Sequence, residues 1–332
     1  MTIASQTVEQ QAHVGTGVTG IAGRSPAQIA WSRLRRDKVG LASLLVIIIT
    51  VLLAVFAPLV TNILGVNPTE LNTDLIGDGG LPAQGILNSG ITRDHLLGIE
   101  PSVGRDILAR LLYGARVSLL VAGVGTLLTV VLGVAAGLIG GYSGGRVDGA
   151  LGRLMDLILS FPQLILLIAL SPIVVQVLQV RAGIEGQNTA RIIFLILAFS
   201  IFGWPYLARI IRGQVLSLRE REFVEAAVSM GAGTRRILVK EILPNLWVPI
   251  IVYASLLLPT YIASEAALSF LGVGVVEPTP TWGKMLSDSV NYYQVDPLYL
   301  FIPGLALFIV VLAFNLLGDS LRDALDPRAG RS

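Results

Sequence analysis

Long apolar runs separated by polar segments set the pattern of this chain. Six runs contain no Asp, Glu, Lys or Arg: residues 40–57, 117–145, 157–180, 192–208, 242–264 and 297–318. About 20 such residues cross the hydrocarbon core of a bilayer as an α-helix, with some latitude. The pattern therefore predicts an all-α, polytopic membrane protein with six transmembrane helices.

These runs divide the chain into five predicted parts. They are a cytosolic tail with an amphipathic lead-in (1–38), a first transmembrane helix (39–60), an extracytoplasmic segment (61–116), a five-helix core (117–320) and a cytosolic tail (321–332). The extracytoplasmic segment is too long for a simple connection, and loops of that size tend to have a function. It could receive an extracytoplasmic partner or form a plain lid over the bundle.

The basic residues predict the orientation. Of the 24 Lys and Arg residues, 17 lie in the stretches 1–38, 142–156, 209–241 and 319–332. Short loops rich in Lys and Arg stay on the cytosolic side of a membrane. We therefore expect a multi-pass membrane protein with both termini in the cytosol and membrane lipid around it.

Composition limits the chemistry. Charged residues make up 14% of the 332 residues and hydrophobic residues 53%, whereas a soluble domain has about 25% charged residues. The chain has no cysteine, and its two histidines, His13 and His95, are far apart in sequence. We expect no metal site, no cofactor and no nucleic-acid partner.

The longest polar interruption in the hydrophobic second half is residues 220–245, which read EREFVEAAVSMGAGTRRILVKEILPN. Ser217 followed by Glu220 fits a capping box that opens a helix. An apolar face then recurs at steps of one helical turn and consists of Phe223, Val224, Ala227 and Met230. This part of the stretch is predicted to be a short amphipathic helix.

Small residues are predicted to end that helix and start a second one. Gly231 and Gly233 bend the chain without steric cost. Thr234 is expected to cap a helix through Leu243, with Pro244 marking its end. Ala226 and Ala227 would leave room for the surface of a partner. The alternative is an ordinary loop helix that packs on its own bundle.

The same stretch resembles the EAA motif of ABC importer permeases. The matching pattern is Glu225-Ala226-Ala227, three residues, Gly231, nine residues and a close at Leu243-Pro244. Glu241 departs from it, because Ile is usual there. The resemblance implies that a coupling loop (213–244) docks on an ATPase through Glu225, Ala226, Ala227, Met230, Gly231, Ala232, Gly233, Arg235 and Arg236. The basic residues could instead lie near anionic lipid.

Further blocks match one branch of this importer family in the expected order. Among them are LYGARVSLLV from Leu112, GGYSGGRVD from Gly140, EAALSFLGVGV from Glu265 and FNLLGDSLRDALDPR from Phe314. Together they resemble the C-type permease of the dipeptide and oligopeptide importers, a branch that includes nickel and glutathione permeases. The resemblance implies the fold of a type I ABC importer permease and a location in a bacterial inner or plasma membrane.

That resemblance also implies an assembly. A C-type permease pairs with a B-type permease, two ABC ATPase subunits bind below, and an extracytoplasmic substrate-binding protein docks from outside. The chain itself lacks the GxxxxGK[ST] phosphate loop. We therefore expect no enzymatic activity in this chain, with ATP bound and hydrolysed by the partner subunits.

Features inside the spans leave other functions to weigh. Gly133, Gly137 and Gly141 recur every four residues and permit close helix packing, either within the chain or against a partner permease. Ion-coupled carriers usually need an intramembrane ionisable group. The one candidate is Glu265, which we expect at the membrane interface, paired or hydrated. An ion-coupled secondary carrier and a membrane scaffold are the alternatives, and no substrate-binding residue is identified.

Overall fold

The computed structural model describes residues 31–85 and 89–325. The predicted lead-in therefore falls only partly within the described residues, and both ends of the chain, 1–30 and 326–332, lie outside them. Six described helices are long and apolar enough to cross a membrane: Lys38–Val55, Ile107–Ser143, Gln163–Val180, Gln187–Leu218, Thr234–Phe270 and Pro297–Leu325. This confirms the six predicted spans, although their bounds differ.

The elements follow one another almost without interruption. In chain order they are α2 (Lys38–Val55), α3 (Ala57–Leu64), a 3-10 turn (Thr73–Leu75), α4 (Ile107–Ser143), α5 (Gly145–Leu159), α6 (Gln163–Val180), α7 (Gln187–Leu218), α8 (Glu222–Ser229), α9 (Thr234–Arg236), a π-helical segment (Ile237–Ile242), a 3-10 turn (Leu243–Leu246), α10 (Trp247–Phe270), α11 (Trp282–Ser289) and α12 (Pro297–Leu325). The described residues form isolated β-bridges but no strand.

The second span begins ten residues before the predicted run. Asp106 starts α4 by accepting a hydrogen bond from the backbone N–H of Ala109 on Oδ1, at 2.7 Å. The predicted run, 117–145, contains no charged residue and so excluded Arg110 and Arg116, but both residues lie within this helix. A helix of 37 residues is about 55 Å long, so α4 extends well beyond a hydrocarbon core of about 30 Å.

The third predicted run is two helices. The amphipathic α5 ends at Leu159, and α6 starts at Gln163, with Pro162 as its N-cap residue. Proline cannot donate a backbone hydrogen bond, which explains the break. Pro172, Pro205, Pro259 and Pro303, by contrast, lie inside helices.

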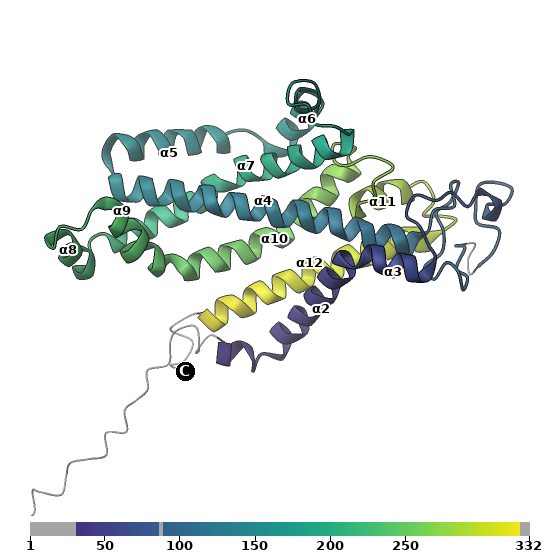
Figure 1. Cartoon of the computed structure of the whole chain (residues 1–332), viewed down its shortest axis with the longest axis horizontal. Helices are drawn as coiled ribbons and strands as arrows, with labels where there is room; N and C mark the ends of the chain where they lie inside the picture. Colours follow the sequence, from purple (N-terminus) through teal and green to yellow (C-terminus); the bar gives the residue numbers. More distant parts are fainter. Residues whose placement is uncertain (1–30, 86–88, 326–332) are drawn as a thin grey trace, which may run out of the picture.

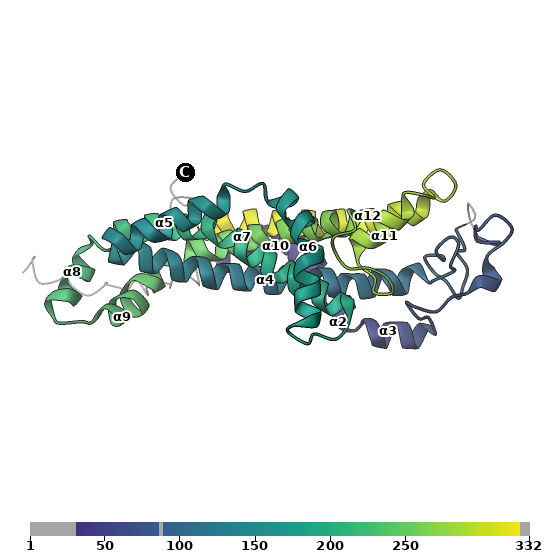
Figure 2. The same ribbon diagram turned by 90° about the horizontal axis from the view of Figure 1, so that it is seen from above.

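The molecule is elongated (Figure 1). α4, α7 and α10 run along its length, α6 stands out to one side, and α2 and α12 lie together. α8 and α9 are at one end in both views, whereas α3 and the long segment before α4 are at the other (Figure 2).

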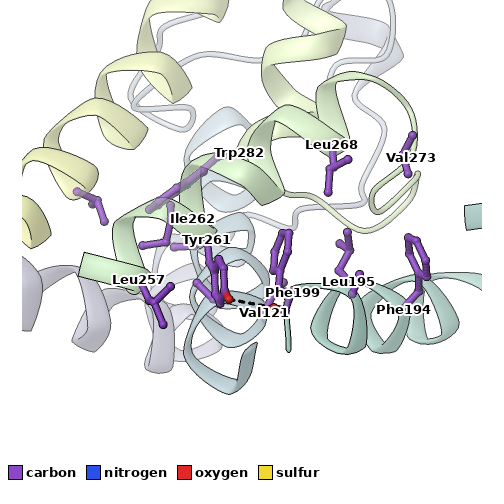
Figure 3. Packing of buried hydrophobic residues seen from close by; sticks show 14 of the residues in the cluster. Val121, Phe194, Leu195, Phe199, Leu257, Tyr261, Ile262, Leu268, Val273 and Trp282 are labelled. Atoms are coloured by element: carbon purple, nitrogen blue, oxygen red, sulfur yellow. Dashed lines mark hydrogen bonds between the residues drawn. The ribbon is translucent and has the colours of Figure 1, made fainter. Parts of the chain in front are cut away.

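The core lies where α4, α7 and α10 meet (Figure 3). The rings of Phe199 and Tyr261 stack with their centroids 4.7 Å apart. The Tyr261 hydroxyl lies 2.9 Å from the carbonyl oxygen of Phe199, to which it donates, and 2.9 Å from Thr129 Oγ1. These contacts fix α10 against α7 and α4.

Of the two expectations for Glu265, paired or hydrated, the structure shows the first, with hydroxyl partners. Its side chain is fully buried in α10. One carboxyl oxygen accepts a hydrogen bond from Ser118 Oγ at 2.6 Å, and the other accepts one from Ser269 Oγ at 2.7 Å. The hydroxyl donors of α4 and α10 satisfy this carboxyl inside the core, where sequence hydropathy gave no sign of them.

Candidate coupling site

α8 begins without a side-chain cap. The carbonyl oxygen of Arg221 accepts hydrogen bonds from the backbone N–H groups of Val224 and Glu225, at 2.9 and 3.1 Å. The predicted capping box is wrong because α7 continues through Leu218, which places Ser217 in the preceding helix. The first turn of α8 carries Glu222 and Glu225, and negative charge is favourable at this end of a helix.

The end of α8 is a Schellman motif centred on Gly231. The backbone N–H of Gly231 donates to Val228 O at 2.9 Å, and that of Ala232 donates to Ala227 O at 3.0 Å. Gly231 has φ +79°, a conformation that is costly for residues with a Cβ. The prediction that Gly231 ends the helix is confirmed. Gly233 has φ −71° and is the N-cap of α9, so its own backbone requires no glycine.

The second predicted helix is wrong in its start and its end. Thr234 is the first residue of α9 and makes no capping bond. Pro244 does not end the helix, because a π-helical segment and a 3-10 turn continue the chain into α10. The side-chain amide of Asn245 donates to Glu241 O at 2.7 Å. Such local changes of helical pitch satisfy backbone groups near a proline, so residues 234–270 form one long helical element.

One face of the coupling loop packs on the inner end of the bundle. Val224, Ala227 and Ile237 are 1%, 5% and 2% exposed. Val224 and Ile237 belong to an apolar cluster with α7, α4 and the start of α10, which includes Leu138, Leu207, Ile211, Val215, Ile242 and Leu246. Ala227 leaves no room for a partner, contrary to the prediction, because its side chain is already buried within its own chain.

The other face is exposed. Met230 is 82% exposed, and the exposed residues on this face also include Glu225, Ala226, Gly231, Gly233, Arg235 and Arg236, with Ala232 half-buried. Within the described residues, none of the charged members forms a salt bridge. Phe223 was predicted on the apolar face but is 41% exposed. The result is a protruding surface that combines flexible apolar side chains with unpaired charges, a composition that suits contact with another protein.

The coupling loop rests on a tightly packed helix pair. A Cβ built on Gly133, Gly137 or Gly141 of α4 would lie 2.9, 2.6 or 2.8 Å from the Cβ of Leu207, Ile211 or Val215 of α7, respectively. Of the two alternatives for this glycine repeat, packing within the chain is therefore the one observed. Because the side chains of α7 that fill these gaps also contact the coupling loop, loop and helix pair form one packed unit.

Ion pairs also attach α5 to α7 near this end. Arg212 Nη2 lies 2.6 Å from Asp148 Oδ2, and Arg209 pairs with Asp156. The hydrogen bond from Arg212 lowers the pKa of Asp148 below its ordinary value. Arg209 directly follows the fourth uncharged run, 192–208. In the structure it pairs with a carboxylate of α5.

Sequence reasoning missed a charge cluster at the opposite end. Glu100, Arg105, Arg110, Glu277 and Tyr299 make up this outer charge cluster. Arg110 is fully buried, with Nε 2.6 Å from Glu100 Oε1 and Nη2 2.7 Å from Glu277 Oε1. Burial acts to raise the pKa of Glu277, but the guanidinium groups of Arg110 and Arg105 hold it below its ordinary value. The cluster joins the long segment before α4 to α4 itself, to α12 and to the segment before α11.

Two family models match the sequence. Residues 130–331 match the binding-protein-dependent transport system inner membrane component, and residues 25–74 match the N-terminal TM domain of oligopeptide transport permease C. The first match covers more than half of the chain and includes the coupling loop and most of the helix pair on which it packs.

Curated relatives are similar over almost the whole chain. The dipeptide transport system permease protein DppC of Alkalihalophilus pseudofirmus is 38% identical over 92% of this chain and 90% of its own length. The oligopeptide transport system permease protein OppC of Escherichia coli K12 is 37% identical over 93% of both chains. The glutathione transport system permease protein GsiD of Pectobacterium atrosepticum is 34% identical over 92% of both.

The fold is also similar to a solved structure. A chain of the MetNI methionine ABC transporter, in an inward-facing conformation, superposes with a TM-score of 0.51 at 20% identity. The match covers 65% of this chain and 96% of the other. At this identity the likeness concerns the fold of the helical core alone.

Proposed function

The chain belongs to the family of binding-protein-dependent transport system inner membrane components, and on that premise we propose that it is a permease subunit of an ATP-driven importer of di- and oligopeptides. It forms half of the translocation pathway. The names of its relatives at 37% and 38% identity support the peptide substrate.

The observation that carries this proposal is the exposed face of the coupling loop. Glu225, Met230 and Arg235 lie exposed at one end of the molecule, while the opposite face of the same loop is packed on α7. An element that is exposed outside and fixed inside can receive a force and pass it to the spans. We assign this face to the groove of an ABC ATPase subunit.

The remaining partners follow from the family. A B-type permease completes the pathway, a second ATPase subunit binds that permease, and a substrate-binding protein docks from the extracytoplasmic side. In this arrangement the coupling loop and both termini face the cytosol, and ATP binds to the partner subunits, so that this chain needs no cofactor and is not itself an enzyme.

The mechanism is a rigid-body movement. Closure of the ATPases on ATP displaces the coupling loop, which is packed on α7 and continuous with α10. Because these spans move with the loop, the pathway opens alternately to the two sides of the membrane. The packed unit thus has two arrangements. Binding of nucleotide to the ATPase shifts the equilibrium between them.

The structure disfavours the ion-coupled carrier. A coupling carboxyl must exchange its ion or proton with water. Glu265 is fully buried, and each of its oxygens already accepts a hydroxyl hydrogen bond. It therefore acts as part of the core, and the energy source lies on another chain.

The docking role is tested by co-purification of the ATPase with variants of the chain. Glu225→Lys reverses the charge of the exposed face and Gly231→Pro removes the φ +79° turn. Both variants are expected to enter the membrane and to lose the ATPase. Glu225→Gln removes only the charge and should give partial loss. The matched control is Glu185→Lys, the same charge change at an exposed residue beyond the end of α6.

Normal recovery of the ATPase with both Glu225→Lys and Gly231→Pro would refute the docking role. The substrate is tested separately with the reconstituted complex and its binding protein. Dipeptides and oligopeptides are expected to stimulate ATP hydrolysis, whereas stimulation by glutathione or nickel alone would assign the chain to another branch of the family.

A further inference from the structure

A cavity of about 230 Å³ opens between three spans. Its lining comes from the start of α6, the middle of α7 and the middle of α10, and consists of Gln163, Phe202, Gly203, Tyr206, Tyr253, Leu256, Leu257, Thr260 and Tyr261. Figure 3 shows one of these residues, Tyr261, beside Phe199 of α7. The cavity therefore lies near the middle of α7 and α10 and beside the start of α6.

Several polar side chains of this cavity have no partner. Gln163, Tyr206 and Tyr253 make no hydrogen bond to any part of the chain that the structure describes. Tyr206 is nevertheless 54% exposed at the middle of a span. In contact with lipid such groups would cost free energy, because hydrocarbon offers no hydrogen bond. Their position therefore indicates that this face of α7 and α10 contacts water or a polar ligand.

The lining also carries no charge. Its polar groups are phenol hydroxyls, one amide and the Thr260 hydroxyl, which already donates to Leu256 O at 2.8 Å. Hydroxyls and amides both donate and accept hydrogen bonds. Such a surface can bind the N–H and C=O groups of a peptide main chain and does not select for the charge of its side chains. Toward the proposed cytosolic end, Arg209 pairs with Asp156, so the two opposite charges cancel and add no net charge near the cavity.

The size of the cavity indicates a half-site. Complete small-molecule pockets have volumes of about 300–1,000 Å³, and this one is smaller and open at Tyr206. Two further features lie at the same height: Pro205 and Pro259, next to the lining residues, interrupt helical hydrogen bonding in α7 and α10. Both helices can therefore bend where the cavity lies.

We propose that this cavity is one half of a peptide-contact site in the translocation pathway, closed by the partner permease, in which Gln163, Tyr206 and Tyr253 bond the main chain of the passing peptide. The inference rests on the proposed function and adds the residues that touch the substrate. The unpaired hydroxyls on α7 and α10 and the unpaired amide at the start of α6 carry it.

Cysteine labelling tests the proposal in the complete transporter, because the natural chain has no cysteine. Tyr206→Cys and Thr260→Cys are reconstituted with the partner permease, ATPases and binding protein, and this chain is probed with a charged, water-soluble thiol reagent. Both positions are expected to react, and transported peptide is expected to slow the reaction at least threefold. Ile201→Cys is the matched control, since Ile201 is exposed on another, apolar face of α7 and should not react.

A second measurement uses milder variants. Tyr206→Phe and Tyr253→Phe keep the rings and remove the hydroxyls. Together they are expected to lower uptake at limiting peptide by about five- to thirtyfold, the range for the loss of one or two hydrogen bonds at about 1 kcal/mol each, while ATPase association stays normal. Tyr142→Phe, at the inner end of α4, is expected to leave uptake unchanged.

The outcomes separate this inference from the proposed function. If the unsubstituted transporter imports no peptide, the proposed function fails. If it imports peptide but Tyr206→Cys and Thr260→Cys are as unreactive as Ile201→Cys, the cavity faces lipid or is filled by the partner permease, and the inference is overturned. Labelling without protection by peptide, together with normal uptake by the Tyr→Phe pair, also overturns it.

Discussion

Replacement of Gly137 by alanine tests the close packing of α4 against α7. The added Cβ would lie 2.6 Å from Ile211 Cβ and 2.8 Å from Ala208 O, whereas carbon atoms pack at about 3.5–4.0 Å. The two helices must therefore separate locally by about 1 Å. Overpacking of this kind costs about 1–3 kcal/mol.

The same substitution at Gly123 is the matched control. Gly123 lies in the same helix, and a Cβ placed there has no atom within 4 Å. Alanine is favoured over glycine inside a helix by about 0.5–1 kcal/mol, and this gain is common to both sites. Subtraction of the two effects therefore isolates the packing cost, and Gly137→Ala should be less stable than Gly123→Ala by about 1–3 kcal/mol.

Thermal unfolding of the purified protein in detergent measures this difference. For a chain of this size, 1 kcal/mol corresponds to roughly 2 °C in Tm, so the two variants should differ by about 2–6 °C. Gly123→Ala should lie slightly above the unsubstituted chain. Equal midpoints for the two variants would refute the close approach of the helices and, with it, the rigid support of the coupling loop.

Two further predictions concern the charged groups. Arg110→Met should destabilise the chain by about 3 kcal/mol, the lower end of the range for a broken buried ion pair, because the buried Glu100 loses one of its two guanidinium partners and keeps only Arg105. The drop in Tm should be partly reversed by the addition of Glu100→Gln. The pKa of Asp148 is lowered in the folded chain, so its pairing with Arg212 stabilises the fold above the ordinary pKa of 3.8 and this contribution is lost as the pH falls through the lowered value. Tm measured between pH 7 and pH 3 should therefore fall at the acidic end, and this part of the fall should be absent in Arg212→Met. If Arg212→Met has the same dependence of Tm on pH as the unsubstituted chain, the pair contributes nothing to stability.

The spans were predictable because bilayer length imposes uncharged windows on the sequence. Their ends were not, because side chains distant in sequence decide them. Arg110 is tolerated inside α4 since it pairs with Glu277, which lies 167 residues later. The hydroxyl partners of Glu265 come in part from another span. Hydropathy along the chain contains neither fact.

In the coupling loop, too, local features were predictable from the sequence and features that depend on other residues were not. The role of Gly231 was predictable, because only its own backbone conformation is involved. The continuation past Pro244 was not, since it depends on a π-helical segment, a 3-10 turn and the amide of Asn245. The cavity around Tyr206 was also missed, because its lining residues come from three helices that are separated in sequence and make no motif.

The positions of the coupling loop and the cavity on the same two helices bear on how force reaches the substrate. Leu207, next to Tyr206, is fully buried in the cluster that holds the loop, and close-packed side chains transmit displacement with little compression. On the other helix, Thr234 and Tyr253 belong to one helical element, about 29 Å apart at 1.5 Å per residue. Movement of the loop must therefore shift Tyr206, because Pro205, the proline inside α7, lies on the far side of Tyr206 from the loop. On the other helix, Pro244 and Pro249 lie between Thr234 and Tyr253, and a bend at these prolines would absorb part of the displacement before it reaches Tyr253.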